Sequence, residues 1–535
     1  MSASPIPQLT TRSKVLERLA DTNAVDVIII GGGATGLGIA LDASLRGLSV
    51  ALFESADFAG ATSSRATKLA HGGVRYLAQG NISLVKEALH ERNTMLRIAP
   101  HLVSPLPFVM PSYACWETPL YGVGLKAYDL LAGKYGLGPT RFLSASQVRY
   151  LMPGINSSGL KGGVMYWDAQ FDDARMALAI ARTAEQAGAL LVNYCSVTNL
   201  VYENGKVTGV TCDDKQFGNT YTVRGRAVIN ATGVWVDALR KQDSAITEKS
   251  YQPLVSPSQG VHLVVDQSFM PGGHALLVPE TTDGRVLFAV PWLGKLILGT
   301  TDTPRTDTPL EPTATDKEVE FIISEASRYL HKKPDKKSVK SIWAGLRPLV
   351  SMKTDNSSTS SISRNHFIEV SKSGLLTVTG GKWTTYRSTA NDVLQYCARY
   401  GLLPMLPRCK TSTYLLVGAH NNKRKVSATP DYQVYGSEAG VVQKIAGGNN
   451  EIASGLTEAM VRFAVRHEYA LTVSDVLARR SRLLFLDAHM ALQAAEQVAN
   501  IMSDEGINDP QLSEFHSLCA NYQLISSTSN YAESN

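Results

Sequence analysis

A glycine-rich segment near the beginning of the chain restricts the fold more than any other feature. The β-branched run at residues 25–30 predicts a buried strand, and the sequence GGGATG at 31–36 follows it directly. Residues 35–46 predict a helix that Gly47 ends, and residues 48–53 predict a second strand. A strand, a helix and a second strand in fewer than 30 residues form a βαβ unit, so the two strands are expected to be parallel.

The glycines of this unit have the spacing G-x-G-x-x-G, and each has a physical role. Gly31 permits the tight turn, Gly33 lets a diphosphate approach the backbone, and Gly36 lets the helix pack on the sheet. The helix N-terminus then presents unpaired N–H groups to the diphosphate. Glu54 ends the second strand, 18 residues after Gly36, and can accept hydrogen bonds from an adenosine ribose. The hexapeptide alone could be a mere turn, but the complete unit predicts a dinucleotide site.

Three features favour FAD over NAD as the dinucleotide. Residues 62–73 form a polar stretch of small residues suited to an extended cofactor, a strand ends in Ala231-Thr232-Gly233, and a second glycine turn lies at residues 380–382. A flavin needs contacts from distant segments, whereas a classical NAD domain is mostly contiguous. The predicted cofactor contacts are Asp26, Gly31, Gly32, Gly33, Ala34, Thr35, Gly36, Glu54, Thr62, Ser63, Ser64, Lys68, Leu69, His71, Gly72, Gly73, Ala231, Thr232, Gly233, Gly381, Lys382 and Thr384.

Composition excludes several other classes of protein. The 535 residues are too many for one core, so two or three domains are expected. A net charge of +5 does not suggest a nucleic-acid partner. The six cysteines are scattered without a C-x-x-C, so we expect no disulfide framework and no metal site. The first 24 residues lack the apolar core of a secretory signal, and we expect an N-terminal extension, with a short transit peptide as the alternative.

The remainder of the chain predicts a mixed architecture. Residues 203–206 predict a hairpin turn, and the short runs 261–265, 275–278, 286–291 and 295–299 predict an antiparallel sheet. Residues 100–138 are rich in proline, glycine and aromatic residues and start without a clear period. Residues 458–469, 472–482 and 483–502 predict helices. No stretch is long and apolar enough to predict a transmembrane helix, because the longest uncharged one, 98–116, contains four prolines.

Several segments together resemble the FAD-dependent glycerol-3-phosphate dehydrogenases of bacterial and mitochondrial inner membranes. They are residues 26–54, 63–77 with HGGVRYL at 71–77, 88–102, GTTDT at 299–303, GLRPL at 345–349 and 380–387, and the resemblance extends over about residues 25–505. It implies an α/β fold: a FAD-binding Rossmann-like domain of the D-amino-acid-oxidase and glutathione-reductase kind, an antiparallel β-sheet cap domain and a C-terminal α-helical domain.

The resemblance also divides the chain into domains. We assign 24–107, 161–250 and 341–400 to the FAD-binding domain, 108–160 to a cap or membrane-facing insertion, 251–340 to the substrate cap domain, 401–525 to the helical domain and 526–535 to a disordered tail. Animal mitochondrial members carry EF-hand calcium loops after the helical domain, but no D-x-D-x-D-G-x5-E follows Met502. We therefore expect no calcium control, as in the bacterial members.

The activity that the resemblance implies is oxidation of sn-glycerol 3-phosphate to dihydroxyacetone phosphate, with hydride transfer to FAD and electrons passed to a quinone. Flavin-dependent alcohol oxidation needs a base for the hydroxyl proton and fixed positive charge for the phosphate. The resemblance implies His262 as the base, with Arg347 and Lys382 as further catalytic residues. It implies a phosphate site made of Arg75, Arg347 and Lys382, with Tyr76 and Thr300 as second-line polar contacts.

Other interpretations of these residues stay open. Each cation could form a structural salt bridge, and a lone histidine in a strand is often a structural residue. His71 beside two glycines could suggest a covalent flavin link, but the family implies non-covalent FAD. The chain could instead be a glycerol-3-phosphate oxidase that uses O2, an amine or amino-acid oxidase on the same fold, or a non-catalytic flavin-binding module.

The expected partners follow from the use of a quinone as the electron acceptor. Ubiquinone or menaquinone is lipid-soluble, so part of the enzyme should contact the membrane surface as a peripheral protein. The aromatic and aliphatic segment 113–131, with Lys126 and Lys134 nearby, suits such a contact, although it could equally be core or a cap-domain interface. We expect a homodimer on the cytoplasmic face of a bacterial inner membrane, with the mitochondrial inner membrane as the alternative location.

Overall fold

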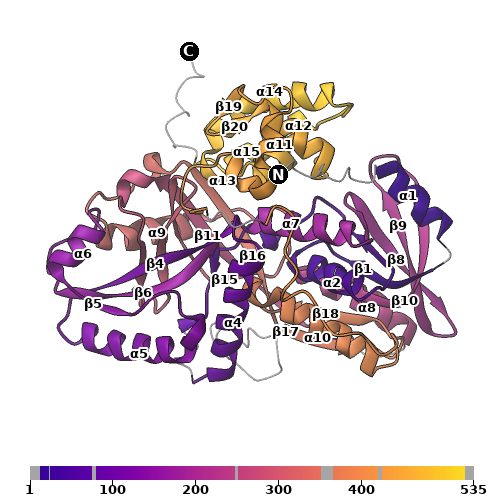
Figure 1. Cartoon of the computed structure of the whole chain (residues 1–535), viewed down its shortest axis with the longest axis horizontal. Helices are drawn as coiled ribbons and strands as arrows, with labels where there is room; N and C mark the ends of the chain where they lie inside the picture. The colour runs from indigo at the N-terminus through magenta and orange to yellow at the C-terminus, as the bar shows by residue number, and fades with distance from the viewer. Residues whose placement is uncertain are drawn as a thin grey trace, which may run out of the picture.

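The computed structural model describes residues 12–524 except 23, 75, 76, 78, 79, 248–250, 351–365 and 420–423. The predicted phosphate contacts Arg75 and Tyr76 and the predicted tail 526–535 therefore lie outside the described residues. Figure 1 shows two sheets side by side along the long axis of the molecule, and the C-terminal helices lie across the top of both.

The predicted βαβ unit is confirmed and forms the centre of an eight-stranded sheet. It consists of β1 (Val25–Ile30), α2 (Ala34–Leu45) and β2 (Val50–Phe53), and β1 pairs in parallel with β2 and with β10 (Thr220–Asn230). The strand order is β17-β18-β10-β1-β2-β7, with β17 at His366–Val370, β18 at Leu376–Gly380 and β7 at Leu190–Val192. All residues of β1 and β2 except Asp26 are buried, which is why both strands are continuous hydrophobic runs.

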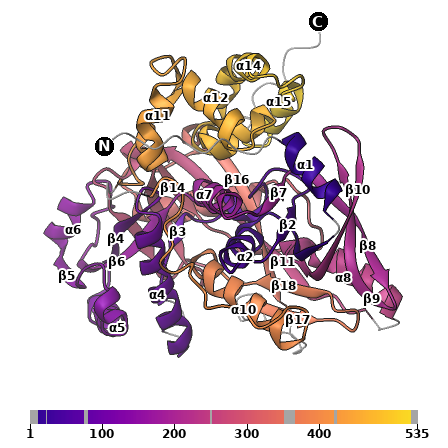
Figure 2. The same cartoon turned by 45° about the vertical axis from the view of Figure 1, so that its right-hand side comes forward.

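Helices and a hairpin complete this half of the molecule. Helix α2 packs between α7 (Asp173–Gln186) and α10 (Tyr386–Arg399), as Figure 2 shows, and α1 (Arg12–Asp21) and α8 (Val236–Thr247) lie near the outer strands. The predicted hairpin is confirmed between β8 (Cys195–Glu203) and β9 (Lys206–Asp214), where Asn204 and Gly205 have φ angles of 51° and 72°. Such positive angles suit an Asn-Gly turn.

The second sheet has ten strands and is almost entirely antiparallel. Its order is β15-β11-β14-β13-β12-β4-β6-β3, with β16 paired to β11 and β5 paired to β6. The strands are β3 (Leu69–Ala70), β4 (Val103–Ser112), β5 (Arg141–Ser144), β6 (Gly162–Phe171), β11 (Val255–Asp266), β12 (Ala275–Val278), β13 (Leu287–Trp292), β14 (Lys295–Gly299), β15 (Thr303–Pro304) and β16 (Ser341–Val350). Helices α4 (Ile82–Ile98), α6 (Ala145–Leu151) and α9 (Asp316–Tyr329) pack around it.

The segment for which the sequence showed no period contains a long strand and a helix. Strand β4 includes Pro105, Pro107 and Pro111, residues that normally argue against a central strand because they cannot donate to the ladder. It nevertheless pairs with β6 along its whole length, and helix α5 (Glu117–Ala132) follows it. The predicted domain boundary between residues 107 and 108 falls inside β4.

Strands β11 and β16 determine the geometry of one wall of the central cavity. They pair antiparallel with His262 opposite Trp343, Gly260 opposite Gly345 and Ser258 opposite Arg347. Because side chains alternate between the two faces of a strand, these positions all share one face of the sheet. The two glycines leave the middle of that face without side chains.

The C-terminal domain is helical, as predicted. Its elements are α11 (Ala439–Gln443), α12 (Glu458–His467), a π-helix (Asp475–Arg480), α13 (Leu483–Leu486), α14 (Ala488–Asp504) and α15 (Leu512–Ala520), with the short strands β19 (Glu451–Ala453) and β20 (Leu456–Thr457). The single helix predicted for 483–502 is interrupted at Asp487, whose side chain accepts a hydrogen bond from the Met490 N–H and caps α14. No helix in the described part of the chain is long and apolar enough to cross a membrane.

Candidate active site

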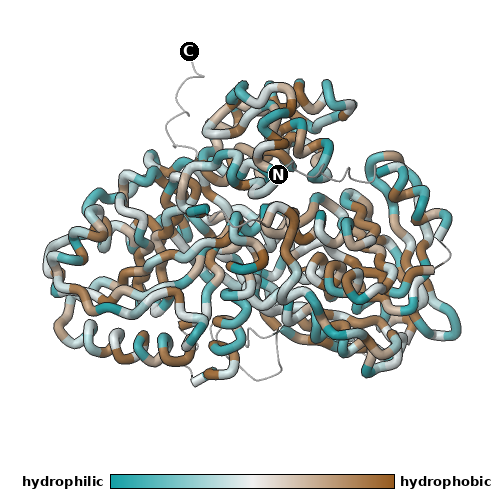
Figure 3. The backbone as a smooth tube through the Cα atoms, viewed as in Figure 1, coloured by the Kyte–Doolittle hydropathy of each residue, from teal (hydrophilic) through white to brown (hydrophobic). Residues whose placement is uncertain are grey.

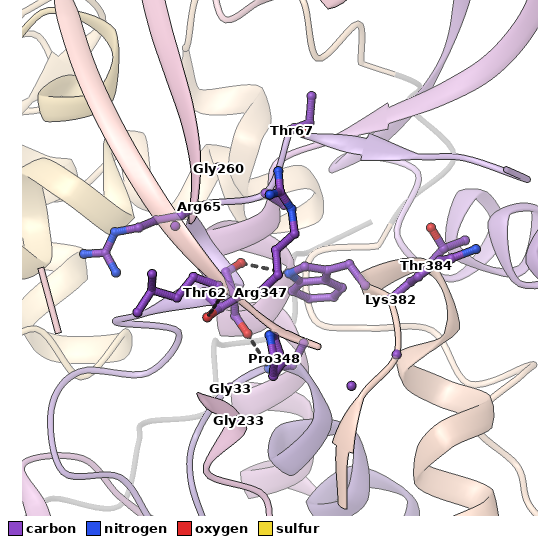
Figure 4. Close-up of a pocket in the computed structure, with 18 of the residues that line it drawn as sticks. Gly33, Thr62, Arg65, Thr67, Gly233, Gly260, Arg347, Pro348, Lys382 and Thr384 are labelled. Carbon is purple, nitrogen blue, oxygen red and sulfur yellow. Dashed lines mark hydrogen bonds between the residues drawn. The ribbon is translucent and has the colours of Figure 1, made fainter. Parts of the chain in front are cut away.

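A cavity of about 1310 Å³ lies where the two sheets meet, and it collects residues from segments that are far apart in the sequence. We call residues 31–36, Glu54, Thr62, Ser63 and 231–233 the nucleotide wall; all of them line the cavity except Gly32 and Gly36, which lie behind the lining. We call Gly260, His262, Thr300 and Arg347 the catalytic wall. Figure 4 shows Gly33 and Gly233 below, Gly260 and Arg347 above, and Lys382 and Thr384 at one side of the same space.

The nucleotide wall lies at the carboxyl ends of the parallel strands. Strands β1, β2, β10 and β18 end at residues 30, 53, 230 and 380, and the residues that follow each of them line the cavity. In open α/β sheets this edge is where dinucleotides bind. Ser63 reinforces the glycine turn, because its Oγ accepts a hydrogen bond of 2.9 Å from the Ala34 N–H at the start of α2.

The glycine turn forms a cradle that a side chain would fill. Gly31 has a φ angle of 108°, and a Cβ atom there would lie 2.6 Å from the Ala231 carbonyl oxygen. A Cβ atom on Gly36 would lie 1.9 Å from the Gly31 carbonyl oxygen. These contacts are shorter than atoms tolerate, so only glycine permits this approach of backbone to backbone and leaves room for a diphosphate.

Glu54 lies beside this cradle and supports it. Its Oε2 accepts a hydrogen bond of 2.7 Å from the Gly32 N–H, and Oε1 accepts one of 2.9 Å from the Ala56 N–H. Burial raises the pKa of Glu54. Each carboxylate oxygen has a second lone pair, so the residue can also accept a hydrogen bond from a ribose hydroxyl in the cavity.

Most of the predicted cofactor contacts meet at this cavity. Those that line it are Gly31, Gly33, Ala34, Thr35, Glu54, Thr62, Ser63, Leu69, His71, Gly73, Ala231, Thr232, Gly233, Gly381, Lys382 and Thr384. Gly32, Gly36, Ser64 and Gly72 are behind the lining. Asp26 lies at the opposite end of β1, where Ser49 donates to its carboxylate from the backbone N–H and the hydroxyl. Lys68 is buried and donates hydrogen bonds to the Ser64 carbonyl and to Asp173.

The catalytic wall brings a guanidinium and an imidazole onto one face. Arg347 Nη2 donates a hydrogen bond of 3.1 Å to Thr300 Oγ1, and Nη1 donates one of 3.1 Å to the Thr301 carbonyl and lies 3.3 Å from Asp302. Between Arg347 and His262 the strand offers only Gly260, where a Cβ atom would lie 2.2 Å from Arg347 Nη2. The catalytic wall therefore presents a cation held by hydrogen bonds and a histidine, and only backbone atoms lie between them.

His262 is held as a neutral imidazole. Its ring stacks on Trp343 with centroids 4.0 Å apart and an interplanar angle of 20°, and its Nε2 lies 3.0 Å from Thr67 Oγ1. Burial, reinforced by the positive charges of Arg347 and Lys68, lowers the pKa of His262 well below its ordinary value. A neutral imidazole can accept a proton, which is what a general base requires.

Three residues at this site had no individual role in the sequence-based prediction. Thr67 contacts His262, Trp343 stacks on it, and the Trp383 indole N–H donates a hydrogen bond of 2.8 Å to the Ser63 carbonyl. Thr67 lies in the polar stretch 62–73 and Trp383 directly follows Lys382, so both belong to recognised motifs. Nothing local marks Trp343, because its contact with His262 depends on the register of β11 and β16.

One end of the cavity is apolar. Leu120, Val123 and Ala127 of α5 line it. So do Phe108, Met110, Tyr166, Leu277 and Phe288 of the second sheet and Val286, which directly precedes β13. Leu120 and Val123 are 58% and 71% exposed, so this end of the cavity reaches the surface of the molecule.

The fold and the site together define an oxidoreductase that uses FAD. The family described as "FAD dependent oxidoreductase" matches residues 26–387, and the family described as "C-terminal domain of alpha-glycerophosphate oxidase" matches residues 409–511. The glycine cradle, the extended cavity and the contributions from four strand ends fit this cofactor, and the chain binds FAD.

Comparison with named relatives shows which kind of FAD-dependent oxidoreductase this chain is similar to. The chain is 42% identical over 530 residues to a probable mitochondrial glycerol-3-phosphate dehydrogenase of Caenorhabditis elegans, covering 93% of this chain and 73% of the relative. It is 36% identical to the mitochondrial enzyme of Schizosaccharomyces pombe, covering 94% and 87%. A crystal structure of the glycerol-3-phosphate dehydrogenase of Bacillus halodurans complexed with FAD superimposes with a TM-score of 0.76 at 28% identity, covering 96% and 98%. The chain belongs to the family of FAD-dependent glycerol-3-phosphate dehydrogenases.

Proposed function

We propose that this chain oxidises the secondary alcohol of sn-glycerol 3-phosphate to the ketone of dihydroxyacetone phosphate. The observation that carries the proposal is the catalytic wall, where a neutral His262 and the cationic Arg347 face one cavity across the bare backbone of Gly260. The cavity also has a nucleotide wall for FAD, which accepts the hydride from the substrate carbon when it is bound.

The phosphate end of the substrate is assigned to Arg347 and Lys382, both of which line the cavity. A guanidinium binds phosphate oxygens in pairs, and an ammonium adds a point charge. The Thr300 hydroxyl accepts from Arg347 and donates to the Thr301 carbonyl at 3.3 Å, so it would donate to a phosphate by replacing the second of these bonds. Arg75 and Tyr76 keep the phosphate-binding role that the family resemblance implies for them. A carboxylate substrate needs only one such cation, which favours a phosphate ester over an amino acid.

His262 is assigned the role of general base for the hydroxyl proton. The positive charge of Arg347 helps to keep the pKa of His262 low in the absence of substrate. A phosphate dianion bound to Arg347 would offset that charge and raise the proton affinity of His262. The base is therefore expected to be strongest when a phosphate ester is bound, which would disfavour oxidation of neutral alcohols such as glycerol.

Anaerobic titration of the holoenzyme tests the proposed substrate. Adding sn-glycerol 3-phosphate should bleach the visible absorbance of the flavin, whereas glycerol or an amino acid should not. Replacing Arg347 with Met should lower the second-order rate constant of bleaching about 10²- to 10³-fold, because a charged partner in a largely buried site contributes about 2–5 kcal/mol. The matched variant Arg328→Met removes an exposed surface arginine and should leave bleaching unchanged. Absence of bleaching by the phosphate ester would contradict the proposed function.

We assign the second half of the reaction to a membrane quinone. The apolar end of the cavity supports this choice, because a quinone ring is apolar and the end opens beside the exposed residues of α5. Oxygen is the competing acceptor, since an oxidase could use the same substrate site. With a water-soluble quinone analogue the reduced enzyme should turn over rapidly, and peroxide formation in air should be a minor side reaction.

A pair of α5 variants tests the quinone route. Val123→Glu places a charge at the apolar end of the cavity and should slow quinone reduction about tenfold or more while anaerobic bleaching is unchanged. Leu130→Glu adds the same charge on the same helix, at an 83% exposed position that does not line the cavity. It should leave both rates unchanged when the water-soluble quinone analogue is the acceptor, because that assay does not need the membrane. Equal quinone rates in the two variants, or stoichiometric peroxide without a quinone, would exclude this route.

We also infer a peripheral contact of α5 with the membrane. Trp116, Leu120, Val123 and Leu130 are exposed by 58–83%, and Figure 3 shows hydrophobic residues recurring along this helix at the lower left. Such a face suits the interface of a bilayer. The mitochondrial relatives favour the mitochondrial inner membrane, the second of the two locations expected from the sequence, over the bacterial one. Flotation with anionic vesicles tests the contact, and light scattering tests the expected homodimer.

A further inference from the structure

Among the described residues, Thr67 is the one that forms a hydrogen bond with the ring of His262 at the cavity. Thr67 Oγ1 lies 3.0 Å from His262 Nε2, and both residues line the cavity. In the described part of the chain Thr67 Oγ1 has no second hydrogen-bond partner, so its remaining capacity is available to a ligand. Arg347, the assigned phosphate-binding group, lines the same cavity, and Figure 4 shows its side chain extending toward the side on which Thr67 lies.

The other nitrogen of His262 cannot reach a substrate. Nδ1 is buried, and it has no hydrogen-bond partner among the described residues. A group that is sealed from the cavity cannot accept a proton from a molecule bound there. If His262 acts as a base, it must do so through Nε2, whose lone pair then faces the Thr67 hydroxyl.

The ring of His262 is also packed on one face and at one edge. Trp343 stacks on one face of His262, and Lys68 Nζ lies 4.6 Å from the Trp343 ring centroid. At the ring edge, a Cβ atom on Gly299 would lie 2.6 Å from His262 Cδ2, so the backbone of β14 closes that side. A ring packed in this way can collect a proton from the cavity through the hydroxyl that already contacts its Nε2.

We propose that the Thr67 hydroxyl relays the substrate proton to His262, an inference that rests on the proposed function. The O–H bond of the substrate breaks and its proton binds Thr67 Oγ, while the proton of Thr67 moves to His262 Nε2. His262 becomes an imidazolium, Thr67 is a hydroxyl again, and the electron pair of the broken O–H bond forms the carbonyl. With FAD bound, the flavin would take up the hydride that the substrate carbon loses.

Three substitutions of Thr67 test the relay. Thr67→Val keeps the shape without the hydroxyl and should lower the rate of anaerobic flavin reduction about 10²-fold, the contribution typical of a positioned acid–base group. Thr67→Ser keeps the hydroxyl and should restore most of the rate. Thr67→Ala leaves space for a water molecule and should be intermediate. In mixtures of H2O and D2O the wild-type rate should depend on the deuterium fraction as a curve, because two protons move, and the Thr67→Val rate should depend on it linearly.

Binding measurements separate a relay from a structural role. Calorimetric binding of dihydroxyacetone phosphate to the oxidised enzyme, and the ratio of flavin to protein, should be unchanged in Thr67→Val within about twofold. Loss of binding or flavin in proportion to the rate would make Thr67 a structural residue and overturn the relay. A Thr67→Val rate equal to wild type would mean that the substrate donates directly to Nε2. If His262→Gln also retained the rate, the proposed base itself would fail, so the two failures are distinguishable.

Discussion

The nucleotide wall and the catalytic wall of the cavity are built by different means. The nucleotide wall is formed largely by backbone and small residues, with Gly31 and Gly36 approaching other backbone atoms so closely that a Cβ atom would overlap them. The catalytic wall is formed mainly by the side chains of His262, Thr300 and Arg347, and its glycine, Gly260, borders side chains instead.

This difference predicts how each wall responds to substitution. Backbone cannot move without displacing a helix or strand, so a change in the nucleotide wall should disturb folding and cofactor binding together. Side chains can shift by rotation, so a change in the catalytic wall should lower turnover and leave the flavin bound. The comparison is weakened if a catalytic-wall variant loses its flavin.

The largest effect is expected from Gly36→Ala in the nucleotide wall. The new Cβ atom would lie 1.9 Å from the Gly31 carbonyl oxygen and would push α2 away from the sheet. We expect at least a tenfold loss of flavin per protein and a destabilisation of about 1–3 kcal/mol. The matched variant Gly440→Ala lies in helix α11 with nothing within 4 Å and should keep both quantities. A Gly36→Ala protein with full flavin content would contradict the backbone origin of this wall.

The next largest effect is expected from His262→Gln in the catalytic wall. Removing a positioned base should slow anaerobic flavin reduction by substrate about 10²- to 10⁴-fold. Flavin content should remain near wild type, because His262 contacts the catalytic wall and not the glycine cradle. Because the pKa of His262 is lowered in the free enzyme, wild-type kcat/KM should show no loss from this group as the pH falls through 6.5. Activity falling with a midpoint near 6.5, and absent from the variant, would show that the histidine is not held neutral.

A smaller effect is expected from Gly260→Ala, the glycine-to-alanine substitution in the catalytic wall. In Gly260→Ala the Cβ atom would lie 2.2 Å from Arg347 Nη2, which is the end of a flexible side chain. The guanidinium can turn away, so we expect the KM for glycerol 3-phosphate to rise about tenfold, the effect of about 1.4 kcal/mol, with flavin and stability retained. Steady-state kinetics measure this directly. A loss of flavin as large as in Gly36→Ala would remove the distinction between the walls.

The same difference explains what the sequence could predict. The βαβ unit and the β8–β9 hairpin were predicted because their glycines and hydrophobic periods lie within short segments. Strand β4 was not, because its prolines contradict the usual strand pattern while pairing with β6 stabilises it. The contacts of the helical domain with the first half, such as those of Arg479 and Arg480 with Asp57, join residues more than 400 positions apart and leave no local pattern.

The candidate active site also contains features that a local sequence pattern predicts and features that it does not. The glycine cradle and Glu54 follow from one contiguous motif, whereas His262 and Arg347 were identified by family resemblance alone. Their juxtaposition depends on the pairing of β11 with β16, which a sequence pattern does not specify. Thr67 required the fold as well, because its contact with His262 spans 195 residues.

His101 offers the smallest and most selective test, because it resembles His262 in burial but lies away from the cavity. It is 3% exposed, and burial, with the charges of Arg175, Arg424 and Arg182, lowers its pKa to about 3. An unfolded histidine has a pKa of about 6.5, so between these values the unfolded state binds one more proton and stability falls as the pH falls. The slope is about 1.4 kcal/mol per pH unit, or about 2 kcal/mol between pH 6.5 and 5. His101→Gln should remove this loss in denaturant unfolding at the two pH values and leave turnover at neutral pH unchanged. If the variant and the wild type lose the same stability on acidification, His101 is protonated in the folded protein. If His101→Gln lowers turnover at neutral pH, a buried histidine outside the catalytic wall also matters to catalysis.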